Sequence, residues 1–342
     1  MKYNFKNDYS EGAHPNILDK LIETNRVQQH GYGEDEYSQQ AKAILKQRIS
    51  NQSAIIHFLS GGTQSNLIVM SFLLRIHEAV ISAKTAHISA NETGAIEATG
   101  HKVITVDTDD GKLTPADVQQ ALNEYGLKPH VVKPRVVFIS NSTEIGTIYT
   151  KAELENLYTF CKSKDLLLYL DGARLGHALT AQSNDLTLAD VSRLTDVFYI
   201  GATKNGALLG EAIVFNKPDL AYEFEFAIKQ KGAMLAKGRV LAIQFLELFK
   251  DNLYFDLAKY ANDMAMKIAD AVKEKGFKFL TNSTTNQIFP ILPNDVIDKL
   301  SEKYLFYVWK EVDEQQSAIR LITSWATDAN KVEEFIKDLK EA

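Results

Sequence analysis

The stretch Asp196-Val-Phe-Tyr-Ile-Gly-Ala-Thr-Lys-Asn-Gly-Ala-Leu-Leu-Gly-Glu211 decides the fold class that we predict. Residues 197–200 are apolar, aromatic and β-branched, which predicts a buried strand. A second apolar run at residues 212–215 predicts another strand. Lys204 lies between them in a turn of small residues, where partial burial would lower its pKa and free the amine for Schiff-base chemistry. On this stretch alone, a turn lysine that faces water is the alternative.

A second motif lies one strand upstream, where the apolar run at residues 166–170 is followed by Asp171-Gly-Ala-Arg174. A strand followed by Asp-x-Ala-Arg, and later a strand followed by Thr-Lys, is a pattern similar to that of pyridoxal-phosphate enzymes of the aspartate-aminotransferase fold type. In those enzymes the Asp pairs with the pyridine nitrogen and the Lys carries the cofactor. Taken singly, Asp171 is also compatible with a helix cap and Arg174 with a solvated charge.

The composition is that of an ordinary soluble globular protein, with 342 residues, 45% hydrophobic residues and 24% charged residues. This length suits one large domain and a smaller one. The net charge of −6 gives no reason to expect nucleic acid or an anionic membrane as partner. The single Cys161 excludes an internal disulfide, the eight histidines show no metal-ligand spacing, and residues 1–8 contain no apolar targeting region. We therefore expect a cytoplasmic protein without a bound metal.

Strand and helix patterns alternate from residue 36 to residue 215, which predicts βαβ units and a mostly parallel sheet. Polar residues follow several of these strands and should meet at the carboxyl edge of the sheet. They are Thr63, His87, Glu144, Asp171, Arg174 and Lys204. Within this region we predict a helix at residues 92–99.

The ends of the chain have a different character. Residues 1–35 predict ordered, glycine-punctuated loops around one helix at residues 16–25. After Pro218 we predict helices at 219–229, 238–249, 253–275 and 328–340, and short strands at 278–280, 287–292, 305–309 and 318–323. The predicted organisation is an N-terminal segment, 1–35, that lines the site and an interface, a large α/β domain, 36–245, and a small α+β domain, 246–342.

The turn Ser60-Gly-Gly-Thr-Gln-Ser-Asn66 lies between a predicted strand, 54–59, and a predicted helix. Free backbone N–H groups at such a helix N-terminus suit a phosphate. The P-loop lysine and the G-x-G-x-x-G pattern are both missing, which disfavours ATP and dinucleotides. A tight turn with a Thr or Ser cap is the alternative.

Taken together, these motifs resemble those of the low-specificity threonine aldolases of the aromatic β-eliminating lyase/threonine aldolase family. The resemblance runs nearly end to end. It is carried by Asn7-Asp8, Tyr32-Gly-Glu-Asp35, Gly62-Thr-Gln-Ser-Asn66, Ala86-His87, Asp171-Gly-Ala-Arg174, Thr203-Lys204 and Arg320-Leu-Ile-Thr323.

The resemblance implies an α/β PLP-dependent transferase-like fold (fold type I) and a pyridoxal 5′-phosphate (PLP) cofactor. It also implies a lyase that cleaves L-threonine, L-allo-threonine or a similar β-hydroxy-α-amino acid to glycine and an aldehyde. Family members are homodimers or homotetramers with sites at the dimer interface. The alternative is a PLP-dependent β-eliminating lyase or aminotransferase for another amino acid. A PLP-binding protein without turnover and a nucleotide-binding α/β protein are more distant alternatives.

The resemblance also implies roles for single residues, which we give in three groups. For the cofactor, Lys204 would carry PLP as a Schiff base, Asp171 would pair with the pyridine nitrogen and His87 would stack on the ring. For the phosphate and its surroundings the residues are Gly62, Thr63, Gln64, Thr203 and Arg174. For the substrate they are Arg174 and Arg320, which would clamp the carboxylate, together with Asn7 and with Tyr32, which would serve the neighbouring subunit.

Two positions depart from the family pattern. The family usually has Glu-Asn-Thr-His near the substrate side chain, whereas this chain has Asn141-Ser-Thr-Glu144. A carboxylate desolvated in a cleft can serve as a general base, so Glu144 is a catalytic candidate, with a solvated loop acid as the alternative. Many family members have an Arg that binds the cofactor phosphate across the subunit interface. This chain has no match for it, and in our interpretation Lys237 takes its place. Of the remaining histidines, we expect His57 in the core, His177 on a helix surface or behind the site, and His14 and His30 near the cleft.

Overall fold

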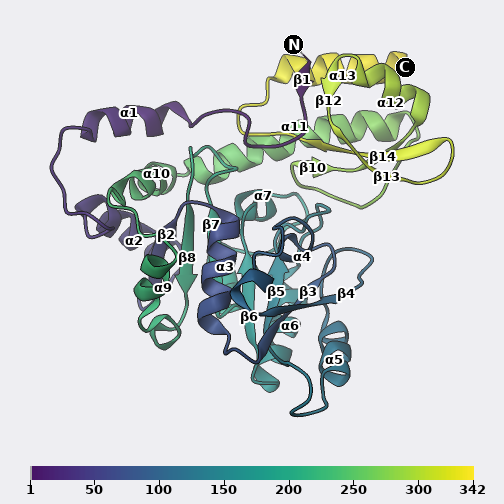
Figure 1. The fold of residues 1–342 in the computed structure, drawn as a ribbon. Helices are drawn as coiled ribbons and strands as arrows, with labels where there is room; N and C mark the ends of the chain where they lie inside the picture. Colours follow the sequence, from purple (N-terminus) through teal and green to yellow (C-terminus); the bar gives the residue numbers. More distant parts are fainter. Residues whose placement is uncertain (1) are drawn as a thin grey trace.

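A seven-stranded sheet forms the centre of this computed structural model, which describes residues 2–342 (Figure 1). Across the sheet the strands are β2 (Ile55–Leu59), β8 (Glu211–Phe215), β7 (Val197–Gly201), β6 (Leu167–Asp171), β5 (Lys133–Ser140), β3 (Glu78–Ala83) and β4 (Lys102–Val106). Strand β8 runs in the direction opposite to the other six strands of this sheet. The mostly parallel sheet predicted from the sequence is therefore confirmed.

Helices surround this sheet and connect its strands (Figure 1). They are α2 (Glu36–Arg48), α3 (Gly62–Leu73), α4 (His87–Ala90), α5 (Pro115–Glu124), α6 (Lys151–Ser163), α7 (Leu175–Leu179), α8 (Leu188–Arg193), α9 (Phe224–Gln230) and α10 (Arg239–Lys250), with 3₁₀ turns η1 (Glu97–Thr99) and η2 (Pro218–Ala221). Three helices begin with a complete capping box, formed at Thr114, Thr150 and Thr187. Such a box satisfies backbone donors at the helix start and fixes where the helix begins.

Two predicted helices are wrong in their extent. The segment 92–99 is not one helix, because Thr93 and Gly94 have positive φ angles of 53° and 71° that interrupt it. Its helical residues are limited to η1, while the short α4 precedes it. The segment 219–229 is likewise divided into η2 and α9, because Glu223 has a φ of 63°. A single residue in the left-handed region is enough to end a helix.

The C-terminal part contains a five-stranded antiparallel sheet packed against helices. Its elements are α11 (Leu253–Glu274), β9 (Lys278–Phe279), β10 (Gln287–Ile288), β11 (Pro290–Pro293), α12 (Asn294–Ser301), β13 (Tyr307–Glu311), β14 (Gln316–Ile322) and α13 (Ala329–Glu341). The sequence analysis missed α12 and joined β10 to β11. Otherwise the α+β character that we predicted for this part is observed.

The N-terminal segment crosses from one part of the molecule to the other. Its strand β1 (Tyr3–Asn4) pairs in parallel with β12 (Tyr304–Leu305), and Phe5 is fully buried among C-terminal side chains. The chain then runs to α1 (Pro15–Thr24), which lies at the opposite end of the view in Figure 1. Residues 6–14 of this segment therefore pass over the boundary between the two sheets.

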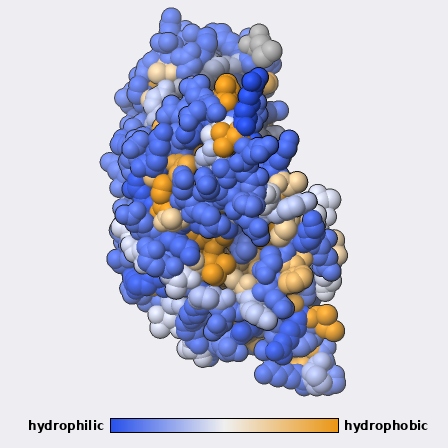
Figure 2. Space-filling view, turned by 90° about the vertical axis from the view of Figure 1, so that its left-hand side faces the viewer, coloured by the Kyte–Doolittle hydropathy of each residue, from blue (hydrophilic) through white to orange (hydrophobic). Residues whose placement is uncertain are grey.

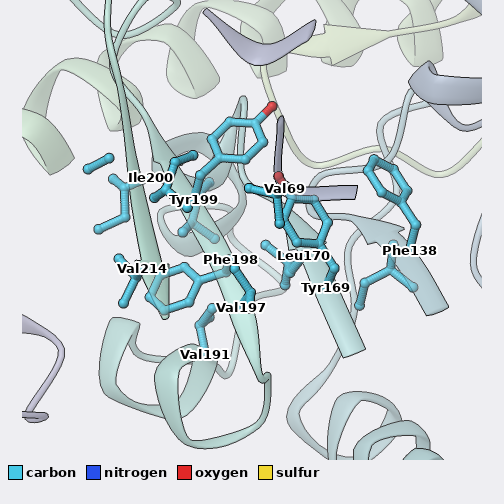
Figure 3. Close-up of a cluster of buried hydrophobic side chains, with 14 of the residues drawn as sticks. Val69, Phe138, Tyr169, Leu170, Val191, Val197, Phe198, Tyr199, Ile200 and Val214 are labelled. Carbon is cyan, nitrogen blue, oxygen red and sulfur yellow. The ribbon is translucent and has the colours of Figure 1, made fainter. Parts of the chain in front are cut away.

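Two main hydrophobic clusters support the two sheets, and Figure 3 shows the centre of the larger one around Phe198 and Leu170. Helix α11 belongs to both, since Leu257 packs in the large cluster and Met264 in the small one. The boundary expected at residue 245 lies inside α10, and the division of the chain into domains stays a prediction.

The surface view in Figure 2 shows a mostly hydrophilic face with apolar side chains gathered near its middle. Among residues 2–342, none of the helices has both the length and the apolar character that a bilayer crossing requires. Cys161 is a free, buried cysteine in α6.

The ends of β6 and β7 approach each other so closely that only glycine fits between them. A Cβ atom on Gly172 would lie 1.8 Å from the carbonyl oxygen of Tyr199, and one on Gly201 would lie 2.6 Å from that of Ala173. A backbone oxygen cannot move away cheaply, so these two glycines fix the spacing between the segments that carry Asp171 and Lys204.

We expect Gly172→Ala to lower the free energy of unfolding by about 3 kcal/mol, because the added methyl group overpacks a rigid backbone contact. Urea unfolding followed by circular dichroism would measure this change. Gly12→Ala is the matched control, since a Cβ there meets no atom within 4 Å. Equal stability of the two variants would contradict the close-approach argument.

Candidate active site

A cavity of about 610 Å³ opens at the carboxyl edge of the large sheet. Its walls come from the N-terminal segment, the strand ends of the large sheet, and β13 and β14 of the small sheet. Most of the residues predicted from the sequence line it together. These are Asn7, Gly62, Thr63, His87, Glu144, Asp171, Arg174, Thr203, Lys204 and Arg320. Gln64, Tyr32 and Lys237 are not among the lining residues.

Lys204 follows β7 in the tight turn between β7 and β8. Its amine has no hydrogen bond and no ion pair with the residues that the structure describes, 2–342. Burial lowers the pKa of Lys204, and the neighbouring Arg174 lowers it further. The turn itself is fixed, because Asn205 donates to the Tyr254 carbonyl at 2.6 Å and Ala202 N–H donates to Gly210. The arrangement provides a held, partly desolvated amine, which is the form that attacks carbonyl carbons.

Asp171 is the last residue of β6 and is held by neutral donors. Its Oδ1 accepts hydrogen bonds from the Tyr199 hydroxyl at 2.5 Å and from Ala173 N–H at 3.0 Å. Its Oδ2 accepts from the Asn66 amide at 3.1 Å, and the oxygen of that amide accepts from Tyr169. Figure 3 shows Tyr169 and Tyr199 on adjacent strands with their hydroxyls directed toward the same edge of the sheet. Within residues 2–342, neutral groups alone make the hydrogen bonds that hold this carboxylate.

His87 begins α4 and is oriented by a buried acid. Its Nδ1 lies 2.9 Å from Glu92 Oε1, and the same oxygen accepts a hydrogen bond from Asn66. The imidazole remains partly exposed to the cavity, whereas the Glu92 side chain is fully buried. Asn66 therefore links the supports of His87 and Asp171.

The N-terminus of α3 faces the cavity without a side-chain cap. The N-cap residue is Gly61, and Gly62 and Thr63 line the cavity directly after it. The uncapped N–H groups and the helix dipole favour an anion at this position. Gln64 has a different task in this structure, because its side-chain oxygen accepts hydrogen bonds from the backbone and hydroxyl of Ser60.

Arg174 is joined to Asp8 by two parallel hydrogen bonds. Its Nε and Nη2 donate to the two Asp8 oxygens at 2.7 and 2.9 Å. Asp8 also accepts from the Asn286 amide at 2.9 Å. Burial alone would raise the pKa of Asp8, but Arg174 and Lys204 hold it well below the usual range. Two of the donors of Arg174 are therefore occupied within the protein.

Arg320 of β14 is held by aromatic rings. Its guanidinium carbon lies 4.8 Å from the centre of the Trp309 ring and 5.1 Å from that of Tyr307. Within residues 2–342 its buried Nε has no hydrogen-bond partner. Stacking fixes the plane of a guanidinium while leaving its N–H groups free. Arg320 is thus the cation of this cavity that is best prepared to receive a carboxylate.

Glu144 follows β5 and is partly buried at the cavity wall. Its Oε1 accepts hydrogen bonds from Ser140 Oγ at 2.7 Å and from His87 N–H at 2.9 Å. Burial raises the pKa of Glu144, and these two hydrogen bonds only partly oppose the effect. The alternative of a solvated loop acid does not fit this position.

The sequence analysis missed several residues that support the site, although their neighbours were identified. Glu211 lines the cavity, and it stands directly before the apolar run at residues 212–215. Asp8, Asn66, Glu92 and Tyr199 act through the contacts described above. Asp8 and Asn66 could have been found from the sequence, because they belong to the family motifs Asn7-Asp8 and Gly62-Thr-Gln-Ser-Asn66.

The remaining predicted residues lie outside the cavity. His177 is fully buried in α7, so the helix-surface alternative is wrong. Neither of its ring nitrogens has a hydrogen-bond partner among the described residues. Burial lowers the pKa of His177 to about 4. His57 packs edge-on against Phe224, in agreement with a core position. The cavity lining includes neither His14, which caps α1, nor the exposed His30.

Comparison with known proteins shows similarity to one enzyme family over most of the chain. The family model described as beta-eliminating lyase matches residues 9–294. The low specificity L-threonine aldolase of Pseudomonas aeruginosa is 31% identical over 98% of this chain and 96% of its own length. That of Escherichia coli K12 is 23% identical over 75% of each protein.

Solved structures agree with this result. A structure of the Leishmania major threonine aldolase superposes with a TM-score of 0.97 and 47% identity, covering 99% of both chains. A single mutant of Thermus thermophilus aspartate aminotransferase gives a TM-score of 0.72 at 14% identity, covering 99% of this chain and 91% of its own. At that identity the likeness shows the fold alone, which is fold type I.

We expect Asp8→Asn to lower the free energy of unfolding by about 3 kcal/mol at neutral pH, because Arg174 is left buried without its counter-charge. The folded-state pKa of Asp8 lies below its unfolded value. Its stabilisation is therefore complete above about pH 4 and is lost as the pH falls through the folded-state pKa. Urea unfolding of both proteins should show a difference that shrinks in acid.

Asp165→Asn provides the control for this prediction, since Asp165 pairs with Arg135 at the surface. That variant should unfold like the unmodified protein. A stability loss for Asp8→Asn that does not depend on pH would argue against an ionised Asp8.

Proposed function

Because the chain belongs to the beta-eliminating lyase family, we propose that it is a PLP-dependent aldehyde lyase. Its substrates are L-threonine, L-allo-threonine or a similar β-hydroxy-α-amino acid, and its products are glycine and an aldehyde. The observation that carries this proposal is the free amine of Lys204 in one cavity with Asp171 and His87. The likeness to threonine aldolases over nearly the whole chain supports the substrate class.

The cavity offers a suitable group for each of three parts of PLP: the aldehyde carbon, the ring nitrogen and the phosphate. Lys204 offers an unpartnered amine, Asp171 offers a carboxylate held by neutral donors, and α3 offers an uncapped helix N-terminus. A Cβ on Gly62 would lie 3.0 Å from the Tyr199 hydroxyl, so glycine there leaves room for the hydroxyl that holds Asp171. The residues present therefore fit the cofactor.

When bound, PLP supplies an electron sink for breaking the Cα–Cβ bond of the substrate. Lys204 would hold it as a Schiff base, Asp171 would keep the proton on its ring nitrogen, and His87 would lie against the ring. The backbone of Gly62, Thr63 and Gln64 would bind the phosphate. Hydrogen bonds from Tyr199 and Asn66 already hold the Asp171 carboxylate in place. It therefore needs no rearrangement to accept a further hydrogen bond from an N–H donor.

For the substrate carboxylate, we assign the main role to Arg320 and a supporting one to Arg174 and Asn7. Arg320 keeps its donors free between two rings, whereas Arg174 has committed two donors to Asp8. Asn7 lines the cavity, and its side-chain oxygen accepts from Tyr9 N–H and Ser10, which leaves the amide nitrogen for a ligand. The substrate carboxylate would therefore meet one cation whose donors are free, Arg320, and one with two donors already bound to Asp8, Arg174.

For the β-hydroxyl proton, we assign Glu144 as the general base. Its raised pKa brings the carboxylate closer to the operating pH, which is what a base that both takes and returns a proton requires. Ser140 and His87 N–H hold one oxygen, so the other oxygen is free to accept the proton.

The assembly and the location form part of the same proposal. Tyr32 is 54% exposed, and Lys237 is exposed as well, so neither serves the cavity of its own chain. We propose a homodimer or homotetramer in which these two residues reach the phosphate end of the neighbouring site. A cytoplasmic location is inferred from the single free Cys161.

The first test is the visible absorption spectrum of the purified protein with PLP. We expect a yellow absorption band that is lost in Lys204→Ala, and release of acetaldehyde and glycine when L-threonine is added. Production of 2-oxobutanoate and ammonia would instead establish elimination, and a keto acid without ammonia would establish transamination. If no band forms in the presence of PLP, the cofactor assignment fails.

A second test concerns Glu144. We expect Glu144→Gln to lower kcat for L-threonine cleavage on the order of a hundredfold, with little change in KM, because the amide cannot accept the proton. In the unmodified protein kcat should rise with pH through the raised pKa of Glu144, since the ionised form is the base. Ser140→Ala removes a bond that stabilises the carboxylate, so it should move this rise to higher pH. A rise that survives in Glu144→Gln would assign the base elsewhere.

A further inference from the structure

Glu211 is a buried acid of the cavity to which the mechanism above gives no role. It is the first residue of β8, where its Cα pairs with Gly201 of β7 and Leu59 of β2. Because β8 is antiparallel to its neighbours, its first residue lies at the edge where those two strands end. Only 4% of Glu211 is exposed, yet it lines the same cavity as Lys204.

The hydrogen bonds of Glu211 use only one of its two oxygens. Oε1 accepts from the Thr203 hydroxyl at 2.9 Å, and Thr203 in turn accepts from Gly210 N–H at 3.0 Å. The buried Oε2 has no partner within residues 2–342. An ionised carboxylate with a bare buried oxygen is costly, whereas the neutral acid buries no charge and carries a proton that it can donate to an amine that comes within reach.

The charges around Glu211 favour the same form. The titratable groups that face it are Lys204, Asp171 and the phenols of Tyr169, Tyr199 and Tyr254. Burial raises the pKa of Glu211 well above its usual range, and the nearby Asp171 adds to the increase. Lys204 opposes it, but no ion pair within 4 Å joins the two side chains in residues 2–342. The amine of Lys204 is also shifted toward its neutral form.

We propose that Glu211 is a neutral carboxylic acid in the resting enzyme, and that it gives its proton to the Lys204 amine when that amine is released from the cofactor. In this transfer the O–H bond of Glu211 breaks and an N–H bond forms on Lys204. A carboxylate and an ammonium remain, and the reverse transfer restores the uncharged amine. The inference rests on the proposed function, because it assumes that Lys204 carries PLP.

The role assigned here is that of a proton store for Lys204. A lysine that must attack a carbonyl has to be uncharged, and a lysine that has left has to be kept from attacking again. One proton shared between Glu211 and Lys204 meets both needs, and the two groups then titrate as a pair. A purely structural acid that only receives the Thr203 hydrogen bond would be replaced by glutamine without loss.

The experiment is infrared difference spectroscopy of the PLP-loaded protein before and after methoxyamine. Methoxyamine captures the aldehyde of PLP and frees Lys204, whichever amino acid the enzyme acts on. We expect the carbonyl stretch of a protonated carboxylic acid at rest, and its loss when Lys204 is freed. The band should be missing in Glu211→Gln, which keeps the acceptor for Thr203. Glu211→Asp retains an acid and should shift the position of the band. This second variant tests the assignment of the band to Glu211 even if Glu211→Gln folds poorly.

Glu247→Gln is the matched control, because Glu247 is an equally buried acid in α10 that pairs with Lys250 outside the cavity. Its spectrum should match that of the unmodified protein. We further expect Glu211→Gln to lower kcat on the order of a hundredfold with KM little changed.

Three results would overturn the proposal: no acid band at rest, a band that methoxyamine leaves intact, or a lost band that persists in Glu211→Gln. The last result would assign the proton to another carboxyl group of the cavity. Failure of the aldolase assignment has a separate signature, namely methoxyamine-sensitive PLP without acetaldehyde from L-threonine.

Discussion

The ion pair between Asp8 and Arg174 holds together the three parts of the chain that build the cavity. Arg174 follows the central strand β6, Asp8 belongs to the N-terminal segment, and Asn286 connects this pair to the small sheet. Asn286 also donates to the Thr323 carbonyl beyond β14, which keeps the end of that strand in place. Because two buried charges must stay paired, the relative positions of these segments are set by electrostatics as well as by apolar packing.

The acids in and beside the cavity are kept in different states by their different neighbours. Asp8 faces a guanidinium and stays ionised, whereas Glu144 and Glu211 are served mainly by hydroxyl or backbone donors. Desolvation then dominates for these two, so their pKa values rise while that of Asp8 falls. A proton acceptor, a proton donor and a permanent anion can thus lie in and beside one cavity, although they are far apart in the sequence.

Much of the fold and of the site could be predicted because the motifs are local. An apolar run followed by Asp171 or by Lys204 marks a strand end, and parallel strands bring such ends to one edge. Glu211 escaped this reasoning because periodicity does not reveal the direction of a strand. Only the antiparallel insertion of β8 between β2 and β7 carries its first residue to that edge.

Other features depend on contacts that no local pattern records. The helix expected at residues 92–99 is broken where Glu92 turns inward to hold His87. The stacking of Arg320 on Trp309 joins two strands of the small sheet. Tyr32 and Lys237 are exposed and do not line the cavity, so no contact within the chain accounts for their predicted role.

The pairing of β1 with β12 has a consequence for the order of biosynthesis. A ribosome makes Phe5 well before β14, yet Phe5 is buried among side chains of the C-terminal part and its carbonyl accepts a hydrogen bond from Ile322 N–H. Asn7 and Asp8 follow directly, so the substrate end of the cavity can form only after β14 has been made. The large sheet can form earlier, while the chain is still attached. A truncated product would therefore contain Lys204 in its sheet without the finished pocket around it.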